Sequence, residues 1–171
     1  MIFLWIVGIA LFVSFGLVVL RGAPYVPSHH REVVRALSEL YPLGPADTLV
    51  DIGSGDGVVL REAARRGARA VGYELNPFLV TVSRLLSRHD PHVLVRLADA
   101  WVSAYPDETT VVYIFAVTRD LPKVVAKLRA HVTATGRPLS LICYGSQPSD
   151  LEPTALLGGH GLYTISPLQG R

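Results

Sequence analysis

The sequence predicts an α/β domain in which helices cover a doubly wound, mainly parallel β-sheet, with one transmembrane helix at the N-terminus. Short apolar segments alternate with segments of helical spacing between residues 48 and 144. A glycine-rich turn follows the first apolar segment, and acidic residues lie at or just beyond the ends of the first three. The first 20 residues are apolar and uncharged. The 171 residues are enough for one such domain.

A helix over residues 28–40 opens the folded part, because Ser28 can cap its first turn and its apolar residues recur at helical spacing. Residues 48–52 form a short apolar segment and predict the first strand. The turn at 53–57 then leads into a second helix, which we expect to end at Gly67.

The second strand is predicted over residues 68–74 and the third over residues 92–97. Between them, residues 76–89 predict a helix. Its expected inner side carries Phe78, Leu79, Val82, Leu85 and Leu86.

Residues 109–116 are apolar and predict a central parallel strand. A helix over 120–132, which Asp120 is expected to cap, leads to a fifth strand over 138–144. The chain beyond this strand is short, so we expect a shortened C-terminus with a last edge strand over residues 162–166.

The uncharged N-terminal segment is long enough to cross a bilayer, since 20 helical residues span about 30 Å. A cleaved signal peptide is the alternative, but no basic residue precedes the apolar run. Arg21, Arg31 and Arg35 follow it and place the remaining chain on the cytoplasmic side. We therefore divide the chain into an anchor over 1–21, a linker with a helix over 22–47, and a domain over 48–171.

Composition excludes several other classes of protein. The formal net charge is only +2, which does not favour a nucleic-acid-binding protein. Four neighbouring arginines are expected on a solvated helix face: Arg61, Arg65, Arg66 and Arg69. The single cysteine, Cys143, lies in an apolar run and predicts a buried thiol, and no metal-binding spacing of Cys and His is present.

The glycine turn carries carboxylates, which distinguishes it from a phosphate-binding loop. Gly53, Gly55 and Gly57 allow a tight turn and a close approach to a ligand. Asp51 and Asp56 would repel a phosphate but suit a cationic ligand. A dinucleotide-binding loop also has a different glycine spacing.

Two further carboxylates follow the next two strands. Glu74 ends the second strand, where an acidic residue can accept hydrogen bonds from both hydroxyls of a ribose. Asp99 follows the third strand and can accept the amine of an adenine, or alternatively cap a turn. The carboxyl ends of parallel strands meet at one edge of the sheet, so these groups define one site.

These motifs resemble the class I, seven-strand methyltransferases that use S-adenosylmethionine and have a Rossmann-like sheet. The Pro24–Ser28 segment, DIGSGDG at 51–57 and GYELNP at 72–77, after an apolar N-terminal helix, resemble one subfamily more closely. That subfamily contains the membrane-associated ATP synthase c-subunit and adenine nucleotide translocase lysine methyltransferases.

The resemblance implies S-adenosylmethionine as cofactor and lysine N-methylation of a membrane-associated protein as activity. The cofactor-binding residues implied by the motifs are Asp51, Gly53, Ser54, Gly55, Asp56, Glu74, Leu75, Asn76, Asp99, Ala100 and Tyr25. Tyr25 and Ser28 would help to cover the site. Phe115, Trp101 and Tyr113 are candidates for positioning the acceptor, although the pattern favours an ordinary core role for each of them. No general base is evident in the sequence.

Two other functions remain open at this stage. The acceptor could be a membrane small molecule such as a quinone or a lipid headgroup, since an anchor suits either substrate. The chain could also be a non-catalytic scaffold with this fold, which need not bind S-adenosylmethionine. Binding of that cofactor would separate a scaffold from an enzyme.

Overall fold

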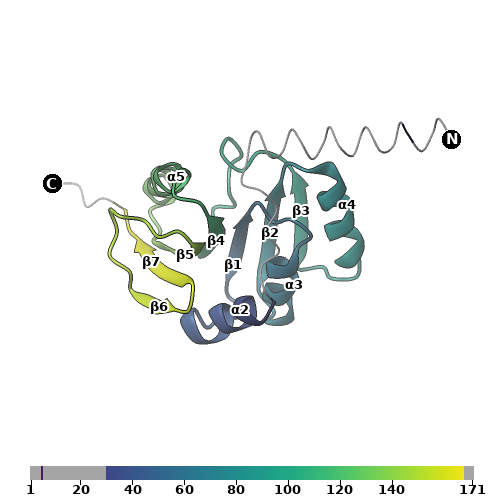
Figure 1. Cartoon of the computed structure of the whole chain (residues 1–171), viewed down its shortest axis with the longest axis horizontal. Helices are drawn as coiled ribbons and strands as arrows, with labels where there is room; N and C mark the ends of the chain where they lie inside the picture. The colour runs from purple at the N-terminus through teal and green to yellow at the C-terminus, as the bar shows by residue number, and fades with distance from the viewer. Residues whose placement is uncertain (1–4, 6–29, 168–171) are drawn as a thin grey trace.

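A computed structural model describes residue 5 and residues 30–167. These contain a seven-stranded sheet in the order β3-β2-β1-β4-β5-β7-β6, in which β1 to β5 are parallel (Figure 1). Strand β7 runs antiparallel to β5 and to β6. The strands are β1 (Thr48–Ile52), β2 (Arg69–Glu74), β3 (Val93–Leu97), β4 (Val111–Ala116), β5 (Leu139–Gly145), β6 (Ala155–Leu157) and β7 (His160–Ile165). The doubly wound, mainly parallel sheet predicted from the sequence is confirmed.

Helices lie on both faces of this sheet. One face carries α2 (His30–Arg35), η1 (Ala36–Leu40), α3 (Val58–Arg65) and α4 (Pro77–Leu86). The other carries α5 (Leu121–Thr135), whose Val124 and Leu128 are completely buried. All five residues of β1 are buried, as the apolar sequence of a central parallel strand requires. The switch in strand order lies between β1 and β4, where the carboxyl ends of the strands can form a ligand crevice.

The predicted shortening of the C-terminus is wrong. Residues 146–167 complete the sheet with the hairpin β6–β7, and β7 pairs with β5 along six residues, from Leu139 with Ile165 to Tyr144 with His160. The expected last edge strand is therefore an internal strand, and the three-residue β6 forms the edge. Gly158 turns the hairpin with φ +57°, so few residues are needed for the connection.

The predicted inner side of the helix after β2 is also wrong in part. Leu79, Val80 and Ser83 face the sheet, whereas Phe78, Leu85 and Leu86 are more than half exposed. The helix begins where expected, because the Asn76 side chain accepts the backbone N–H groups of Phe78 and Leu79. Its apolar residues occupy two faces, and helical periodicity alone did not distinguish the inner from the outer one.

Asp120 does not have the predicted capping role. It precedes α5, but its side chain makes no capping hydrogen bond. Its Oδ1 instead lies 3.4 Å from Nε of the neighbouring Arg119. Asp120 has helical backbone angles, φ −93° and ψ −16°, rather than the extended conformation in which an N-cap side chain reaches the following amides.

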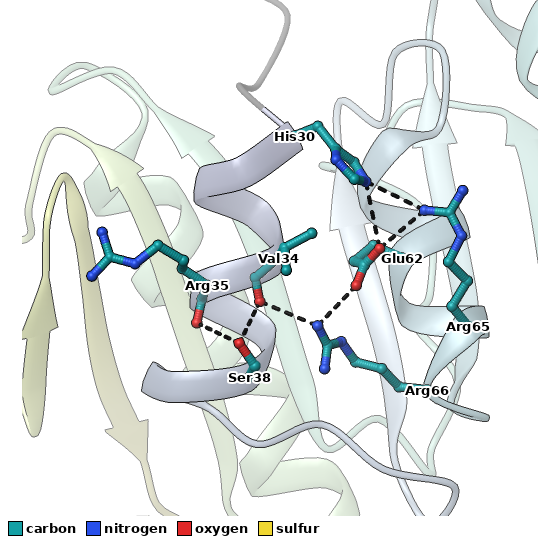
Figure 2. Close-up of polar contacts among 7 residues, drawn as sticks. All are labelled: His30, Val34, Arg35, Ser38, Glu62, Arg65 and Arg66. Atoms are coloured by element: carbon teal, nitrogen blue, oxygen red, sulfur yellow. Dashed lines mark hydrogen bonds and ion pairs between the residues drawn. The ribbon is translucent and has the colours of Figure 1, made fainter.

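A network around the buried Glu62 joins α2 to α3 (Figure 2). Its two carboxylate oxygens lie 3.0 Å from Nη1 of Arg65 and 2.8 Å from Nη2 of Arg66. Arg66 also donates to the carbonyl of Val34 on α2, and His30 lies 3.6 Å from Glu62. Because one carboxylate serves both helices, α2 is held against the helix that follows the glycine turn.

The four arginines near α3 pair with carboxylates. Arg61 pairs with Asp56, and Arg69 pairs with Glu108. Arg65 and Arg69 are exposed as predicted for a solvated face, whereas the side chains of Arg61 and Arg66 are only 19% and 21% exposed. Their neutralisation by carboxylates gives no support to a phosphate-binding patch.

The predicted transmembrane segment at residues 1–20 lies outside the described residues, apart from residue 5. In the part of the chain that the structure describes, no helix has both the length and the apolar character needed to cross a bilayer.

Candidate active site

Glu74 organises the site at the carboxyl end of β2. Glu74 is buried, with only 7% of the residue exposed. Its Oε2 accepts the N–H of Gly55 at 2.9 Å, and its Oε1 accepts the N–H of Asn76 at 2.8 Å. Each carboxylate oxygen can accept a second hydrogen bond, so both remain competent to accept a ribose hydroxyl. Glu74 therefore fixes the glycine turn and presents a charged acceptor at the same edge of the sheet.

The glycine turn bends where the sequence predicts. Gly53, Gly55 and Gly57 have φ values of +73°, +55° and +85°, in the left-handed region that glycine adopts most readily. The N–H groups of Gly53 and Ser54 both donate to the carbonyl of Tyr73, which holds the turn beside β2. A Cβ built on Gly53 would meet no atom within 4 Å, so this glycine leaves open space at the turn.

Asp51 provides a buried carboxyl group at the end of β1, next to this turn. Its burial, followed by the charges of Glu74 and Asp56, raises its pKa from 3.8 to about 8. Carboxylates so placed are stabilised by a cation and destabilised by an anion. The cluster thus fits a cationic cofactor and not a pyrophosphate, as the acidic turn predicts. Asp56 differs from Asp51 because Arg61 lies 3.6 Å from its carboxylate.

The raised pKa of Asp51 predicts that the binding of S-adenosylmethionine depends on pH. A bound cation favours the ionised carboxylate and so lowers its pKa, and a proton is released when the cation binds below about pH 8. Affinity for S-adenosylmethionine should therefore rise between about pH 6 and about pH 8. Calorimetry in buffers of different ionisation enthalpy measures the released proton. Asp51→Asn should flatten the pH dependence, and a wild-type affinity that does not change with pH would contradict this role.

The remaining predicted cofactor residues occupy the expected strand ends. Asn76 caps α4 next to Glu74, and Leu75 is exposed between them. Asp99 follows β3, where its Oδ1 accepts the N–H of Trp101 at 2.8 Å. This contact is the turn-capping role that the sequence left open for Asp99, and it leaves Oδ2 for a ligand amine. Ala100 is buried behind this turn.

Ser54 is buried, and its Oγ has no hydrogen-bond partner among the described residues. Tyr25 and Ser28, which were expected to cover the site, lie outside those residues.

The sequence did not predict the role of Lys127 on α5. Its Nζ donates to the carbonyls of Trp101 and Ser103 and lies 4.5 Å from the centre of the Tyr105 ring. Because α5 lies on the face of the sheet opposite to α3 and α4, Lys127 holds the turn that contains Asp99 from that face. A lysine at helical spacing in an otherwise ordinary helix gives no sequence signal for this long-range contact.

The three positioning candidates lie in different surroundings. Tyr113 is completely buried and its hydroxyl is 2.9 Å from Nε2 of His160, which makes it a core residue of the sheet. Trp101 is half-buried and packs against the core below the Asp99 turn. Phe115 lies near the carboxyl end of β4 and contacts the Tyr144 ring edge-on, with 5.4 Å between centres.

Tyr144 and His160 were missed by the sequence reasoning. Their rings stack 4.3 Å apart beside Phe115, and burial lowers the pKa of His160, which favours its neutral form. Register places Tyr144 opposite both Phe115 and His160. The sequence signal was an aromatic residue at the predicted end of the fifth strand, but the pairing of β5 with β7 could not be read from it.

A sheet in this strand order, with a glycine turn after β1 and carboxylates at the ends of β1, β2 and β3, defines a class I S-adenosylmethionine-dependent methyltransferase. The chain matches a family model described as a methyltransferase domain over residues 50–136, from β1 to the end of α5. It belongs to this family.

Curated relatives share the same region. The ATP synthase c-subunit lysine N-methyltransferases of Rattus norvegicus and Xenopus laevis are 40% and 35% identical over 121 and 120 residues, 68% of this chain in each case. The adenine nucleotide translocase lysine N-methyltransferase of Mus musculus is 48% identical over 63 residues, which cover 36% of this chain and 27% of that protein. The aligned region spans about half the length of these two ATP synthase c-subunit lysine N-methyltransferases, 54% of the first and 52% of the second.

A solved structure shows the same architecture. The RNA methyltransferase from Salinibacter ruber, in complex with S-adenosyl-L-homocysteine, superposes with a TM-score of 0.67 and 29% identity. The match covers 85% of this chain and 97% of that protein. The shared region therefore includes most of the described chain, and the overall fold is that of a solved methyltransferase.

Proposed function

We propose that this chain transfers a methyl group from S-adenosylmethionine to a lysine of a membrane-associated protein. The observation that carries the proposal is the buried pair Asp51 and Glu74 beside the open glycine turn, which provides acidic groups for a cationic nucleoside cofactor. The cofactor supplies an activated methyl group when bound. The chain's own residues orient it and hold the acceptor in line, which is the main requirement of such a transfer.

The lysine acceptor is supported by the two groups of relatives, both named lysine N-methyltransferases. A lysine amine must lose its proton before it can attack, and apolar surroundings lower its pKa. Phe115 and the half-buried Tyr144 offer such surroundings at the carboxyl ends of β4 and β5. We propose these two rings, together with Trp101, as the acceptor-positioning side chains.

Residues 1–21 are proposed as the membrane anchor and residues 22–47 as its link to the catalytic domain over 48–171. Arg21, Arg31 and Arg35 support a cytoplasmic catalytic domain. Both groups of relatives carry a membrane-protein substrate in their names, which suits an enzyme held at a bilayer.

Removal of residues 1–20 should release the protein from membranes without unfolding it. The site residues that the structure describes all lie between Asp51 and Tyr144, and the strands of the described sheet all lie between Thr48 and Ile165. The truncated chain should fractionate with the soluble proteins after a high-salt wash and keep its melting shift with S-adenosylhomocysteine. Full retention in salt-washed membranes would disprove the anchor.

Radioactive S-adenosylmethionine tests the acceptor directly. Membranes from cells that lack the protein are incubated with purified enzyme, with Glu74→Ala as the inactive control. Label in a protein band that yields methyl-lysine on hydrolysis supports the proposal. Label in extracted lipid or quinone would establish the alternative small-molecule acceptor, and label in RNA would place the chain with its Salinibacter ruber neighbour. A scaffold would give no label and no ligand-induced melting shift.

A further inference from the structure

Helix α4 presents an apolar face to the outside of the molecule. Phe78, Leu85 and Leu86 are 52%, 59% and 53% exposed, while Leu79 and Val80 of the same helix are buried. Figure 1 shows α4 at the β3 edge of the sheet, with no other described element covering its outer side. Phe78 lies about two helical turns before Leu85 and Leu86. The three large apolar side chains thus form a stripe along the helix rather than scattered exposure, which marks an interaction surface.

Basic groups flank this outer face. Arg84 donates through Nε and Nη2 to the carbonyl of Val95, and Arg88 donates to the carbonyl of Leu85, which holds both guanidinium groups near the end of the helix. They line an open hollow of about 360 Å³ between α4 and β3, together with Ser87 and Asp90. Ser87 is only 7% exposed, and its Oγ has no hydrogen-bond partner among the described residues.

We propose that the outer face of α4 lies on an anionic phospholipid surface, with Phe78, Leu85 and Leu86 in the interfacial region and Arg84 and Arg88 against lipid phosphates. This inference rests on the membrane attachment in the proposed function and adds a second, reversible contact. An exposed apolar helix face with flanking arginines has the pattern of interfacial helices. Each basic residue near an anionic surface strengthens the contact about five-fold.

The charges beside the outer face of α4 favour a lipid surface over a second copy of the chain or the N-terminal segment as the occupant of this face. A second copy of the chain would bring Arg84 and Arg88 close to the same arginines of its partner, and like charges at an interface oppose association. The apolar N-terminal segment, residues 1–20, has no charged side chain with which to pair them. A phosphate surface satisfies both the apolar stripe and the arginines.

A fluorescent probe on the full-length chain in vesicles tests the contact. Cys143 is completely buried with its pKa raised to about 12, so a thiol-reactive dye added to Leu85→Cys labels the new cysteine. Leu156→Cys is the matched control, because Leu156 is a 64% exposed leucine on β6 at the opposite edge of the sheet. Vesicles contain phosphatidylcholine, with or without phosphatidylglycerol, and lipid-borne nitroxide quenchers.

When phosphatidylglycerol is present, the fluorescence emission of the dye at position 85 should shift to shorter wavelength and be quenched. The emission of the dye at position 156 should do neither. Arg88→Gln should weaken the anionic-lipid-dependent quenching about five-fold. Equal signals at the two positions would overturn the proposal. A dye signal at position 85 that is unchanged without phosphatidylglycerol would also overturn it, since this result is expected if the N-terminal segment covers the face. A signal that depends on the density of protein in the vesicles would overturn it as well, since this result is expected for a second copy of the chain. The readout does not involve methyl transfer, so the proposed enzymatic function can fail or hold independently.

Discussion

Replacement of Glu74 by alanine should lower the affinity for S-adenosylmethionine at least about 100-fold. Two hydrogen bonds from ribose hydroxyls to a charged acceptor would be lost, each worth about 1.5–3 kcal/mol, and about 1.4 kcal/mol corresponds to a factor of ten. The glycine turn would loosen as well, since the N–H groups of Gly55 and Asn76 lose their acceptor. Isothermal calorimetry measures the affinity.

Glu62→Ala is the matched control for this variant. Glu62 is as deeply buried as Glu74, with 6% against 7% of its surface exposed, but it lies in the network between α2 and α3. Its loss leaves Arg66 without its carboxylate and should lower the melting temperature while the cofactor affinity stays near wild type. Unchanged affinity in Glu74→Ala would remove Glu74 from the site.

Gly53→Ala should abolish most of the cofactor binding by placing one methyl group in the open space at the turn. An extra carbon forced into a filled site costs about 1–3 kcal/mol, which corresponds to a loss of up to about 100-fold in affinity. The backbone angle adds strain, because φ at Gly53 is +73°. Thermal melting with and without S-adenosylhomocysteine separates these effects, since a ligand that binds only the folded state raises the melting temperature.

The Gly136→Ala variant measures the effect of backbone strain separately from the loss of space for the cofactor. Gly136 ends α5 with φ +68°, and a Cβ built there also meets no atom within 4 Å. Both variants should therefore lose a similar free energy of unfolding, while only Gly53→Ala loses the ligand-induced shift. A Gly53→Ala protein that melts cooperatively and keeps the full shift would falsify the placement of the cofactor at this turn.

The parallel part of the sheet and its acidic edge were predictable from the sequence because each depends on local patterns. Apolar segments and glycine turns place the five parallel strands within one or two residues of their observed ends. The topology of such sheets then brings their carboxyl ends together, so Asp51 and Glu74 could be assigned to one site without coordinates.

Features that depend on tertiary pairing could not be predicted. The strand β6 was missed because it has only three residues and pairs only with β7. The register of β7 is in turn fixed by its pairing with β5, between residues such as Tyr144 and His160 that are far apart in sequence. The orientation of α4 was misjudged because both of its faces carry apolar residues, and only packing on β2 and β3 selects one. The position of Tyr113 on β4 allowed it to be a wall of the acceptor pocket, but its hydrogen bond with His160 places it in the core.

The Glu62 network also bears on how far the catalytic domain could lie from the membrane anchor proposed at residues 1–21. Since α2 is held to α3 from His30 onward, only residues 22–29 separate the proposed anchor from the part of the chain that this network fixes. Even a fully extended chain of that length reaches only about 30 Å, roughly the thickness of the hydrocarbon layer itself. Under the proposed anchoring, a connection of this length would hold lysines at the membrane boundary at a high effective concentration and would leave lysines on distant soluble domains out of reach.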